Sequence, residues 1–405
     1  MISIYYYHTF FSLQNTAAMV DVEIKPLKEL PTVNNRQSHP FVIDANTYTN
    51  ISYEDFFNNH LRKNVPCIIK NVSTEWEASK KWVNNDKIDF DYLTNQYGNL
   101  LVPVTDCKKI TFDNQPKSEM KFSDYISYWK SNTRDKILYL KDWHLRRCKP
   151  EDKFYTVPKL FGSDWLNEYA QDKHQDDFMF VYMGPSGSWT PMHADVYNSF
   201  SWSVNVSGRK KWYLFPPGEH KKLKDKFKNV ILRFEPDKYK SVTYFEIIQG
   251  KGDAIFVPSG WYHQVENEID TISVNHNWVN GSNIVNVWQN LTKTLDSVKK
   301  EINELRDLKE FSSICQNMLK SLYGMDCEGF AKLIAHIGEK RVAQIEGGSN
   351  ISFNNYKLGK NHCMYDLKCI QDVINLMTKH STFVRNEYKI TENFLIVQNA
   401  LKFIF

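Results

Sequence analysis

The chain of 405 residues has little cysteine, glycine or proline and no long apolar run. Its seven cysteines form an odd set without a CxxC pair, which argues against a disulfide scaffold and favours a reducing compartment. The 16 glycines and 14 prolines are too few for a collagen-like or low-complexity chain. Because a membrane helix needs about 18 consecutive apolar residues, we expect no membrane span.

Neither sign of charge dominates the sequence. The chain has 51 basic and 47 acidic residues, so its charge gives no argument for a nucleic-acid partner, and we expect none. Aromatic residues make up 14% of the chain, which is the opposite of a disordered composition. The length suits one large domain with an appended piece, or two domains.

Three regions of different pattern divide the chain. Residues 1–50 are expected to form a partly irregular N-terminal extension, in which residues 1–18 have no structure of their own. Residues 51–283 form the predicted central domain, and its β-rich core covers about 137–280. Residues 284–405 carry long amphipathic segments, which predict a helical C-terminal region.

The central domain is predicted to begin with an α/β lead-in. Ser52 with Asp55 is typical of a capping box at the start of a helix. Residues 75–82 and 90–97 have helical spacing, whereas residues 137–143 alternate like a strand.

From about 177 to 280 the sequence consists of short β-branched and aromatic runs separated by turn residues. This regular alternation predicts an all-β sandwich or barrel. A charged stretch at 219–240 interrupts the strands and is expected to be an insertion.

One segment of this β region carries candidate metal ligands. His193 and Asp195 are two residues apart, so in an extended chain both side chains lie on the same face. His263 follows a Gly-Asp-x-x-x-Val-Pro-x-Gly-Trp turn that presents it from another strand. Two histidines and one carboxylate form the facial triad of non-haem Fe(II) oxygenases. The alternative is that His193 is a core histidine and Asp195 caps a turn.

A lysine on the strand after the H-x-D pair is the candidate partner of an organic acid. A buried lysine is tolerated when it is paired, and an incoming dicarboxylate supplies such a partner. Lys210 and Lys211 are adjacent, so on a strand one of them faces inward and the other outward. The alternative is that both are exposed on a basic turn.

Several ordered motifs in this region resemble the JmjC family of Fe(II)- and 2-oxoglutarate-dependent oxygenases. The motifs are YLKDWHL, TPMHAD, GRKKWYLFPP, GDAIFVPSGWYHQV and TISVNHNW. The resemblance implies a double-stranded β-helix, a jelly roll of the cupin type, for the JmjC catalytic domain at 51–283. It also implies Fe(II) as the metal and 2-oxoglutarate and O₂ as cosubstrates.

The resemblance assigns a role to individual residues of this sequence. His193, Asp195 and His263 match the metal triad, and no catalytic side chain beyond these ligands is implied. The matched contacts of 2-oxoglutarate are Lys210, Thr190 and Tyr139, with Asn275 as an active-site asparagine. Trp202 and Ser203 are expected to line the pocket, and their alternative is ordinary barrel packing.

The resemblance also implies a protein substrate. It predicts hydroxylation at C4 of a lysine in the eukaryotic peptide-chain release factor, which places the enzyme in the cytoplasm near translation termination. One alternative is a lysine N-demethylase that uses the same iron site. Asp195 shifts the balance toward hydroxylation, because many histone demethylases of the family have H-x-E instead. A catalytically inactive scaffold is the other alternative.

The C-terminal helices have two interpretations. We favour a helical cap on the edge of the barrel, and the other interpretation is a surface for homodimerisation or substrate docking. The basic stretch at 221–228 is interpreted as a solvated loop, with an acidic protein surface as its alternative partner.

Overall fold

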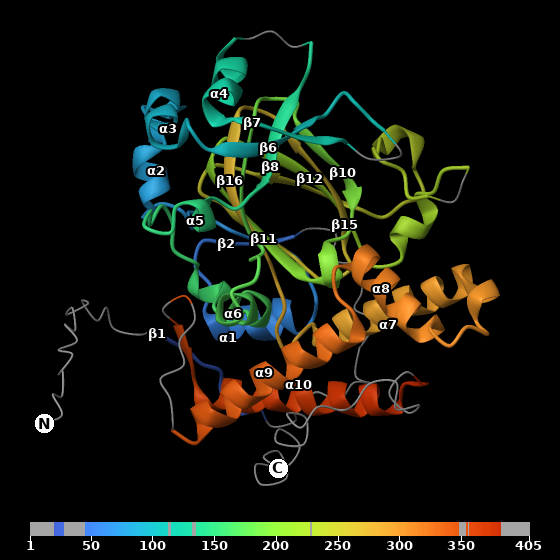
Figure 1. The fold of residues 1–405 in the computed structure, drawn as a ribbon. Helices are drawn as coiled ribbons and strands as arrows, with labels where there is room; N and C mark the ends of the chain where they lie inside the picture. Colours follow the sequence, from blue (N-terminus) through green and yellow to red (C-terminus); the bar gives the residue numbers. More distant parts are fainter. Residues whose placement is uncertain are drawn as a thin grey trace, which may run out of the picture.

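A computed structural model describes most of the chain. The described residues are 20–27, 45–111, 115–131, 135–226, 229–347, 354 and 356–381. The predicted extension 1–18 and the end of the basic stretch lie outside these ranges. Two β-sheets occupy the centre, and long helices gather at one end of them (Figure 1).

The larger sheet has nine strands within the described part of the chain, and its central pairs are antiparallel. In spatial order the strands are β2 (Asn46–Tyr48), β3 (Cys67–Ile69), β14 (Ala254–Val257), β11 (Phe200–Ser207), β16 (Thr271–Trp278), β9 (Met179–Gly184), β8 (Leu138–Trp143), β6 (Leu101–Asp106) and β7 (Lys117–Lys121). Buried side chains of these strands belong to the main hydrophobic core, to which the helices also contribute, and Trp202, Val204, Val274 and Trp278 are nearly fully buried.

The smaller sheet faces the larger one across a central cavity. Its strands in spatial order are β10 (Trp189–His193), β15 (Tyr262–Asn267), β12 (Lys210–Phe215) and β13 (Phe245–Gln249), all antiparallel. Residues of both sheets line this cavity. The predicted double-stranded β-helix with a helical C-terminal region is therefore confirmed.

A tight turn between β11 and β12 crosses from one sheet to the other. Gly208 in this turn has a φ of 93°. A Cβ atom at this position would lie 2.4 Å from the backbone oxygen of Asp270. Glycine is therefore required here both by the left-handed backbone and by the close approach of another chain segment. The turn places Lys210 at the first position of β12, where it faces the interior.

The α/β lead-in packs along the larger sheet. Its helices are α1 (Tyr53–Phe56), which continues as the π-helical turn η1 (Phe57–Leu61), α2 (Glu77–Lys81), α3 (Phe90–Tyr97) and α4 (Phe122–Lys130). Ser52 caps α1, because its hydroxyl accepts from the backbone N–H of Asp55 at 3.0 Å, as predicted. The short hairpin β4 (Val83–Asn84) and β5 (Lys87–Ile88) joins α2 to α3.

Strands β6 and β7 at the edge of the larger sheet were not predicted. Pro103 lies inside β6, and β7 is mostly polar and exposed, so neither strand shows an apolar alternation. Strand β6 pairs with β8, and β7 pairs with β6, so both are held in the sheet by tertiary contacts that a local sequence pattern does not reveal.

The remaining short helices connect strands. They are α5 (Leu145–Cys148), α6 (Trp165–Asp172), and the 3₁₀ turns η2 (Lys159–Phe161), η3 (Val196–Asn198), η4 (Glu219–Lys222) and η5 (Pro236–Lys238). The last two belong to the predicted insertion between β12 and β13. Within the described part of the chain, no helix is both long and apolar enough to cross a membrane.

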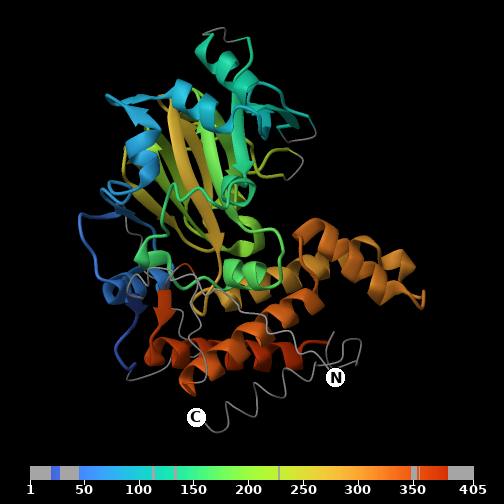
Figure 2. The same cartoon turned by 60° about the vertical axis from the view of Figure 1, so that its left-hand side comes forward.

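The C-terminal region is a group of helices that lies below the two sheets in Figure 2. They are α7 (Ile284–Glu301), the 3₁₀ turn η6 (Asn303–Leu305), α8 (Phe311–Tyr323), α9 (Cys327–Ile345) and α10 (Lys360–Lys379). Helix α8 ends at Gly324, which caps it with a φ of 85°. Strand β17 (Tyr356–Leu358) precedes α10 and pairs in parallel with β1 (Val20–Val22).

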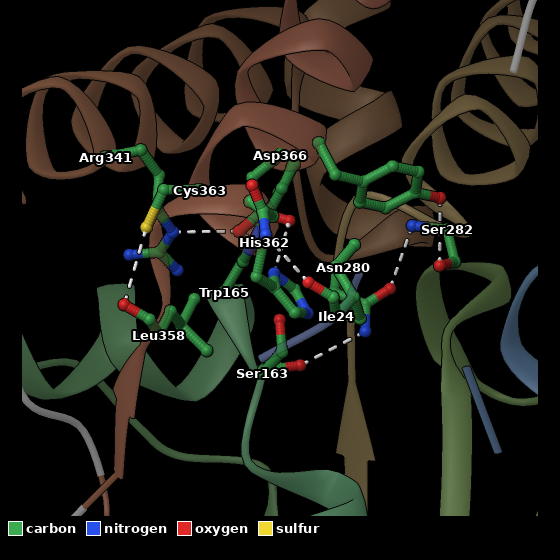
Figure 3. A network of polar contacts seen from close by, with 12 residues as sticks. Ile24, Ser163, Trp165, Asn280, Ser282, Arg341, Leu358, His362, Cys363 and Asp366 are labelled. Atoms are coloured by element: carbon green, nitrogen blue, oxygen red, sulfur yellow. Dashed lines mark hydrogen bonds and ion pairs between the residues drawn. The ribbon is translucent and has the colours of Figure 1, made fainter. Parts of the chain in front are cut away.

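A buried charge network joins the C-terminal helices to the central domain. Arg341 of α9 pairs with Glu168 of α6 and with Asp366 of α10, at 2.8 Å in both cases. Trp165 also donates to Asp366 at 3.0 Å, and Figure 3 shows Arg341 and Trp165 both directed at this carboxylate. All four side chains are nearly fully buried, so α6, α9 and α10 are fixed to one another.

Candidate metal and 2-oxoglutarate site

Two histidines and one aspartate meet at the end of the smaller sheet. His193 ends β10 and His263 lies in β15, and the antiparallel pairing places these residues directly opposite each other. Their ring centroids are 4.2 Å apart. Asp195 follows β10, and each of its two carboxylate oxygens lies 4.0 Å from Nε2 of one histidine. All three ligand atoms lie within 4.8 Å of one another, which is close enough for one metal ion.

Both imidazoles are held in the form that binds a metal through Nε2. Nδ1 of His193 donates to the backbone oxygen of Pro191 at 2.7 Å, and Nδ1 of His263 donates to that of Trp261 at 3.0 Å. Donation from Nδ1 leaves the Nε2 lone pair free on each ring. Burial and the neighbouring His263 lower the pKa of His193, which favours the neutral ring that binds a metal.

A hydroxyl from β11 orients the Asp195 carboxylate, and a strained turn follows this residue. The Ser201 hydroxyl donates to Oδ2 of Asp195 at 2.6 Å, which orients the carboxylate. The next residues form a turn in which Tyr197 and Asn198 have φ values of 57° and 55°. A left-handed backbone costs about 1–2 kcal/mol for an L-residue, and a bulky tyrosine gains nothing locally in return. The turn is therefore maintained by its surroundings.

The cavity that contains the three metal ligands also contains Lys210, which is buried. Its side chain is 2% exposed, and its Nζ donates to the Ser273 hydroxyl at 2.7 Å. Burial lowers the pKa of Lys210 to about 7. No described carboxylate forms an ion pair with it, whereas Lys211 points outward and pairs with Glu246 at 2.7 Å. The prediction that one lysine faces in and the other faces out is confirmed.

The other predicted site residues surround this cavity as well. They are Tyr139, Thr190, Trp202, Ser203 and Asn275, and they come from β8, β10, β11 and β16. The Asn275 side-chain amide donates to Ser273 Oγ at 3.0 Å, so it lies beside the partner of Lys210. Burial raises the pKa of Tyr139, which keeps its hydroxyl protonated and able to donate. The structure thus brings every predicted site residue to one cavity.

Sequence reasoning missed three residues that support this site. Ser201 orients Asp195, Ser273 bonds to Lys210, and the Tyr182 ring lies 5.7 Å from Lys210 Nζ. Ser201 lies outside the family motifs, whereas Ser273 lies inside TISVNHNW, in which Asn275 was the residue assigned to the site. The only available signal was their alternation: Ser201 lies two residues before Ser203, and Ser273 two before Asn275, so each pair shares a face.

The fold and the site define the class of protein. The sequence profile of the cupin-like domain family matches residues 53–284, more than half of the chain. Within this class the chain is 41% identical to 2-oxoglutarate and iron-dependent oxygenase JMJD4 of Gallus gallus, over 82% of this chain and 84% of that protein. It is 40% identical to JMJD4 of Homo sapiens over the same shares. The chain therefore belongs to the JMJD4 family of 2-oxoglutarate and iron-dependent oxygenases.

Two further relatives differ in their names. The arginine-specific demethylase JMJ20 of Arabidopsis thaliana is 38% identical over 69% of this chain and 66% of its own. The bifunctional arginine demethylase and lysyl-hydroxylase psr-1 of Caenorhabditis elegans is 31% identical over 64% of this chain and 66% of its own. Family membership thus defines an oxygenase. The names of its relatives include two different reactions, demethylation of arginine and hydroxylation of lysine.

Proposed function

We propose that this protein is an Fe(II)- and 2-oxoglutarate-dependent lysyl hydroxylase that acts on a eukaryotic peptide-chain release factor. One observation carries the oxygenase chemistry: the His193–Asp195–His263 cluster shares a cavity with Lys210, a buried cation without a carboxylate partner among the described residues. A metal site next to an unpaired cation fits an acid that chelates the metal at one end and carries a second carboxylate at the other.

The three ligand side chains fit a ferrous ion. Neutral imidazole and carboxylate suit iron, whereas a thiolate-rich site would favour zinc. His193 and His263 offer Nε2 while backbone oxygens fix Nδ1, and Asp195 offers the oxygen that Ser201 does not hold. Three ligands on one side leave the rest of the coordination sphere for 2-oxoglutarate and O₂.

The part of the cavity around Lys210 fits the far carboxylate of 2-oxoglutarate. In this proposal Lys210 supplies the positive charge, and the hydroxyls of Thr190 and Tyr139 donate hydrogen bonds. Asn275 fixes the Ser273 hydroxyl beside Lys210. A charged donor with neutral hydroxyls around it is a typical setting for a buried carboxylate.

The bound iron supplies the oxidation of an unactivated C–H bond by O₂, coupled to decarboxylation of 2-oxoglutarate to succinate. This chain contributes the geometry. Its residues hold the metal, orient the cosubstrate and exclude water, with the buried rings of Trp202 and Trp212 as walls of the cavity. No acid or base from a side chain is required for C–H cleavage.

The lysyl substrate is the finer part of the proposal. It is supported by the JMJD4-like sequence motifs, by Asp195 in place of glutamate, and by the name of psr-1, which includes lysyl-hydroxylase. A location in the cytoplasm, close to translation termination, is part of the same proposal.

Mass spectrometry of release factor incubated with the enzyme, Fe(II), ascorbate and 2-oxoglutarate tests this function. We expect a gain of one oxygen atom on a single lysine, with succinate formed in equal amount. The Asp195→Ala enzyme is the matched control and should give neither product, because it lacks one of three ligands. Succinate production without any modified lysine would support the oxygenase activity but contradict the proposal that the release factor is the substrate.

An N-demethylase is the second candidate, because JMJ20 and psr-1 are named as arginine demethylases. Hydroxylation of an N-methyl group releases formaldehyde and lowers the mass of the substrate. Methylated arginine and lysine peptides assayed for formaldehyde therefore separate the two outcomes. The scaffold alternative requires cellular function to survive in a His193→Ala protein.

A further inference from the structure

The backbone turn that carries Asp195 is held by an aromatic cluster from two regions of the chain. Val196, the first residue of the turn, is 52% exposed and therefore contributes little packing to it. The ring of Tyr197 contacts the rings of Phe178 and Tyr323, with centroid distances of 5.4 Å to each. Phe178 belongs to the catalytic domain, whereas Tyr323 is the last residue of α8 in the C-terminal region.

The end of α8 fits closely around Tyr197. The Tyr197 hydroxyl donates to the backbone oxygen of Gly324 at 3.3 Å. A Cβ atom at Gly324 would lie 2.8 Å from the same hydroxyl oxygen. Tyr323 is fixed in turn, because its hydroxyl donates to the backbone oxygen of Val287 in α7 at 3.2 Å. Tyr197 therefore packs closely against the end of α8, which is itself bonded to α7.

This contact lies two residues from the metal ligand Asp195, whose own backbone is extended, and it is made by the first of two strained residues that follow. Tyr197 and Asn198 are both left-handed, and such residues persist where their surroundings determine them. Asn198 donates its N–H to the backbone oxygen of Asp195 at 3.1 Å, and its own oxygen accepts from the Ser259 hydroxyl. If Tyr197 is released, the turn relaxes and Asp195 moves with it.

We propose that Tyr197 is a positioning residue for the metal ligand Asp195, and that the α8–α9 turn holds it in place. The C-terminal helices then set the metal affinity of a site to which they contribute no ligand. The inference rests on the proposed role of Asp195 as a ligand, and it does not depend on which protein is the substrate.

Binding of Mn(II) alone to the full chain, measured by calorimetry in the absence of substrate, tests this inference. Residues that orient metal ligands typically contribute a factor of about 10–100 to affinity. We expect Tyr323→Ala to weaken Mn(II) binding by roughly tenfold and Tyr197→Ala to weaken it at least as much. Tyr323→Phe keeps the ring and loses only the bond to Val287, so it should bind Mn(II) as the wild type does.

Tyr356→Ala is the matched control for general loosening of the C-terminal region. Like Tyr197, Tyr356 is partly buried and joins the two regions through a hydroxyl bond, here to the Val157 backbone oxygen at 2.8 Å. Its Mn(II) affinity should stay within about twofold of wild type. Wild-type affinity in folded Tyr323→Ala, or an equal loss in Tyr356→Ala, would overturn the inference. Asp195→Ala serves as reference: if it too binds Mn(II) normally, the metal site itself is wrong.

Discussion

At the scale of single residues, Lys210 connects the metal site to its cosubstrate. It is buried with one hydroxyl partner and no described carboxylate, whereas the adjacent Lys211 has a carboxylate partner at the surface. Burying an unpaired cation costs folding free energy, so the arrangement is explained when a bound anion supplies the missing charge.

We predict that Lys210→Ala weakens 2-oxoglutarate binding strongly and that Lys211→Ala does not. Removing one partner of a buried ion pair costs about 3–5 kcal/mol, which corresponds to roughly two to four orders of magnitude in affinity. The KM for 2-oxoglutarate in a succinate assay gives the comparison. Equal KM values for Lys210→Ala and the wild type would show that another cation binds the cosubstrate.

A second prediction concerns pH. Because burial lowers the pKa of Lys210 to about 7, the empty site loses its positive charge as the pH rises through this value, and the bound carboxylate must draw a proton back. We expect the affinity for 2-oxoglutarate to fall above pH 7, by up to about tenfold per unit. The slope should vanish in Lys210→Met, and calorimetry in two buffers should show proton uptake on binding by the wild type. A wild-type affinity that is constant from pH 7 to 9 contradicts this.

At the scale of elements, the site is assembled by strand pairing. His193 and His263 are 70 residues apart in the chain and meet because β10 pairs with β15 in that register. Lys210 reaches the same cavity because a tight turn at Gly208 starts β12 in the correct phase. A shift of one residue in either strand would turn these side chains to the other face.

Gly208→Ala should therefore destabilise the fold more than Gly218→Ala. Both glycines have a left-handed φ, so both substitutions introduce strain of about 1–2 kcal/mol. A Cβ at Gly208 would additionally strike the backbone of Asp270, whereas a Cβ at Gly218 meets nothing within 4 Å. Chemical denaturation of the two variants measures the difference. Equal losses of stability would mean that the β11–β12 turn can shift and that Gly208 does not fix the start of β12.

The elements also show what the sequence could and could not predict. The metal ligands, Lys210 and the jelly roll were predictable, because local motifs and strand–turn alternation carry them. Ser201, Ser273 and Tyr182 were not singled out, because their roles arise from which strands pair. Strands β6 and β7 were missed, because Pro103 in β6 and the exposed polar face of β7 hide the strand pattern. Strand β6 is held by pairing with β8, and β7 by pairing with β6.

At the scale of the whole molecule, the C-terminal helices are joined to the catalytic domain through a buried network. Burial would raise the pKa of Glu168, but Arg341 and Lys340 outweigh it and hold that pKa below its usual value. Glu168, Arg341 and Asp366 thus remain charged in the interior and link α6, α9 and α10. The expectation of a helical cap on the barrel and its alternative, a surface for homodimerisation or substrate docking, both remain predictions.

Arg341→Met should destabilise the protein by about 3–5 kcal/mol, because it removes the buried cation that Glu168 and Asp366 share, although Glu168 keeps its ion pair with Lys340 at 2.8 Å. The matched control is Lys332→Met, which removes an exposed i,i+4 pair with Glu328 and should cost less than about 1 kcal/mol. Thermal and urea unfolding measure both. A small effect of Arg341→Met would show that the two regions are not fixed to each other by this network.

The central claim is that His193, Asp195 and His263 bind one ferrous ion while Lys210 binds the far end of 2-oxoglutarate. A crystal structure of the full chain, grown without oxygen in the presence of Fe(II) and 2-oxoglutarate, tests it most directly through the anomalous signal of iron. We predict one iron peak within bonding distance of Nε2 of both histidines and a carboxylate oxygen of Asp195, with the distal carboxylate against Lys210 Nζ. Iron bound elsewhere, or a cosubstrate whose far carboxylate avoids Lys210, would contradict the claim.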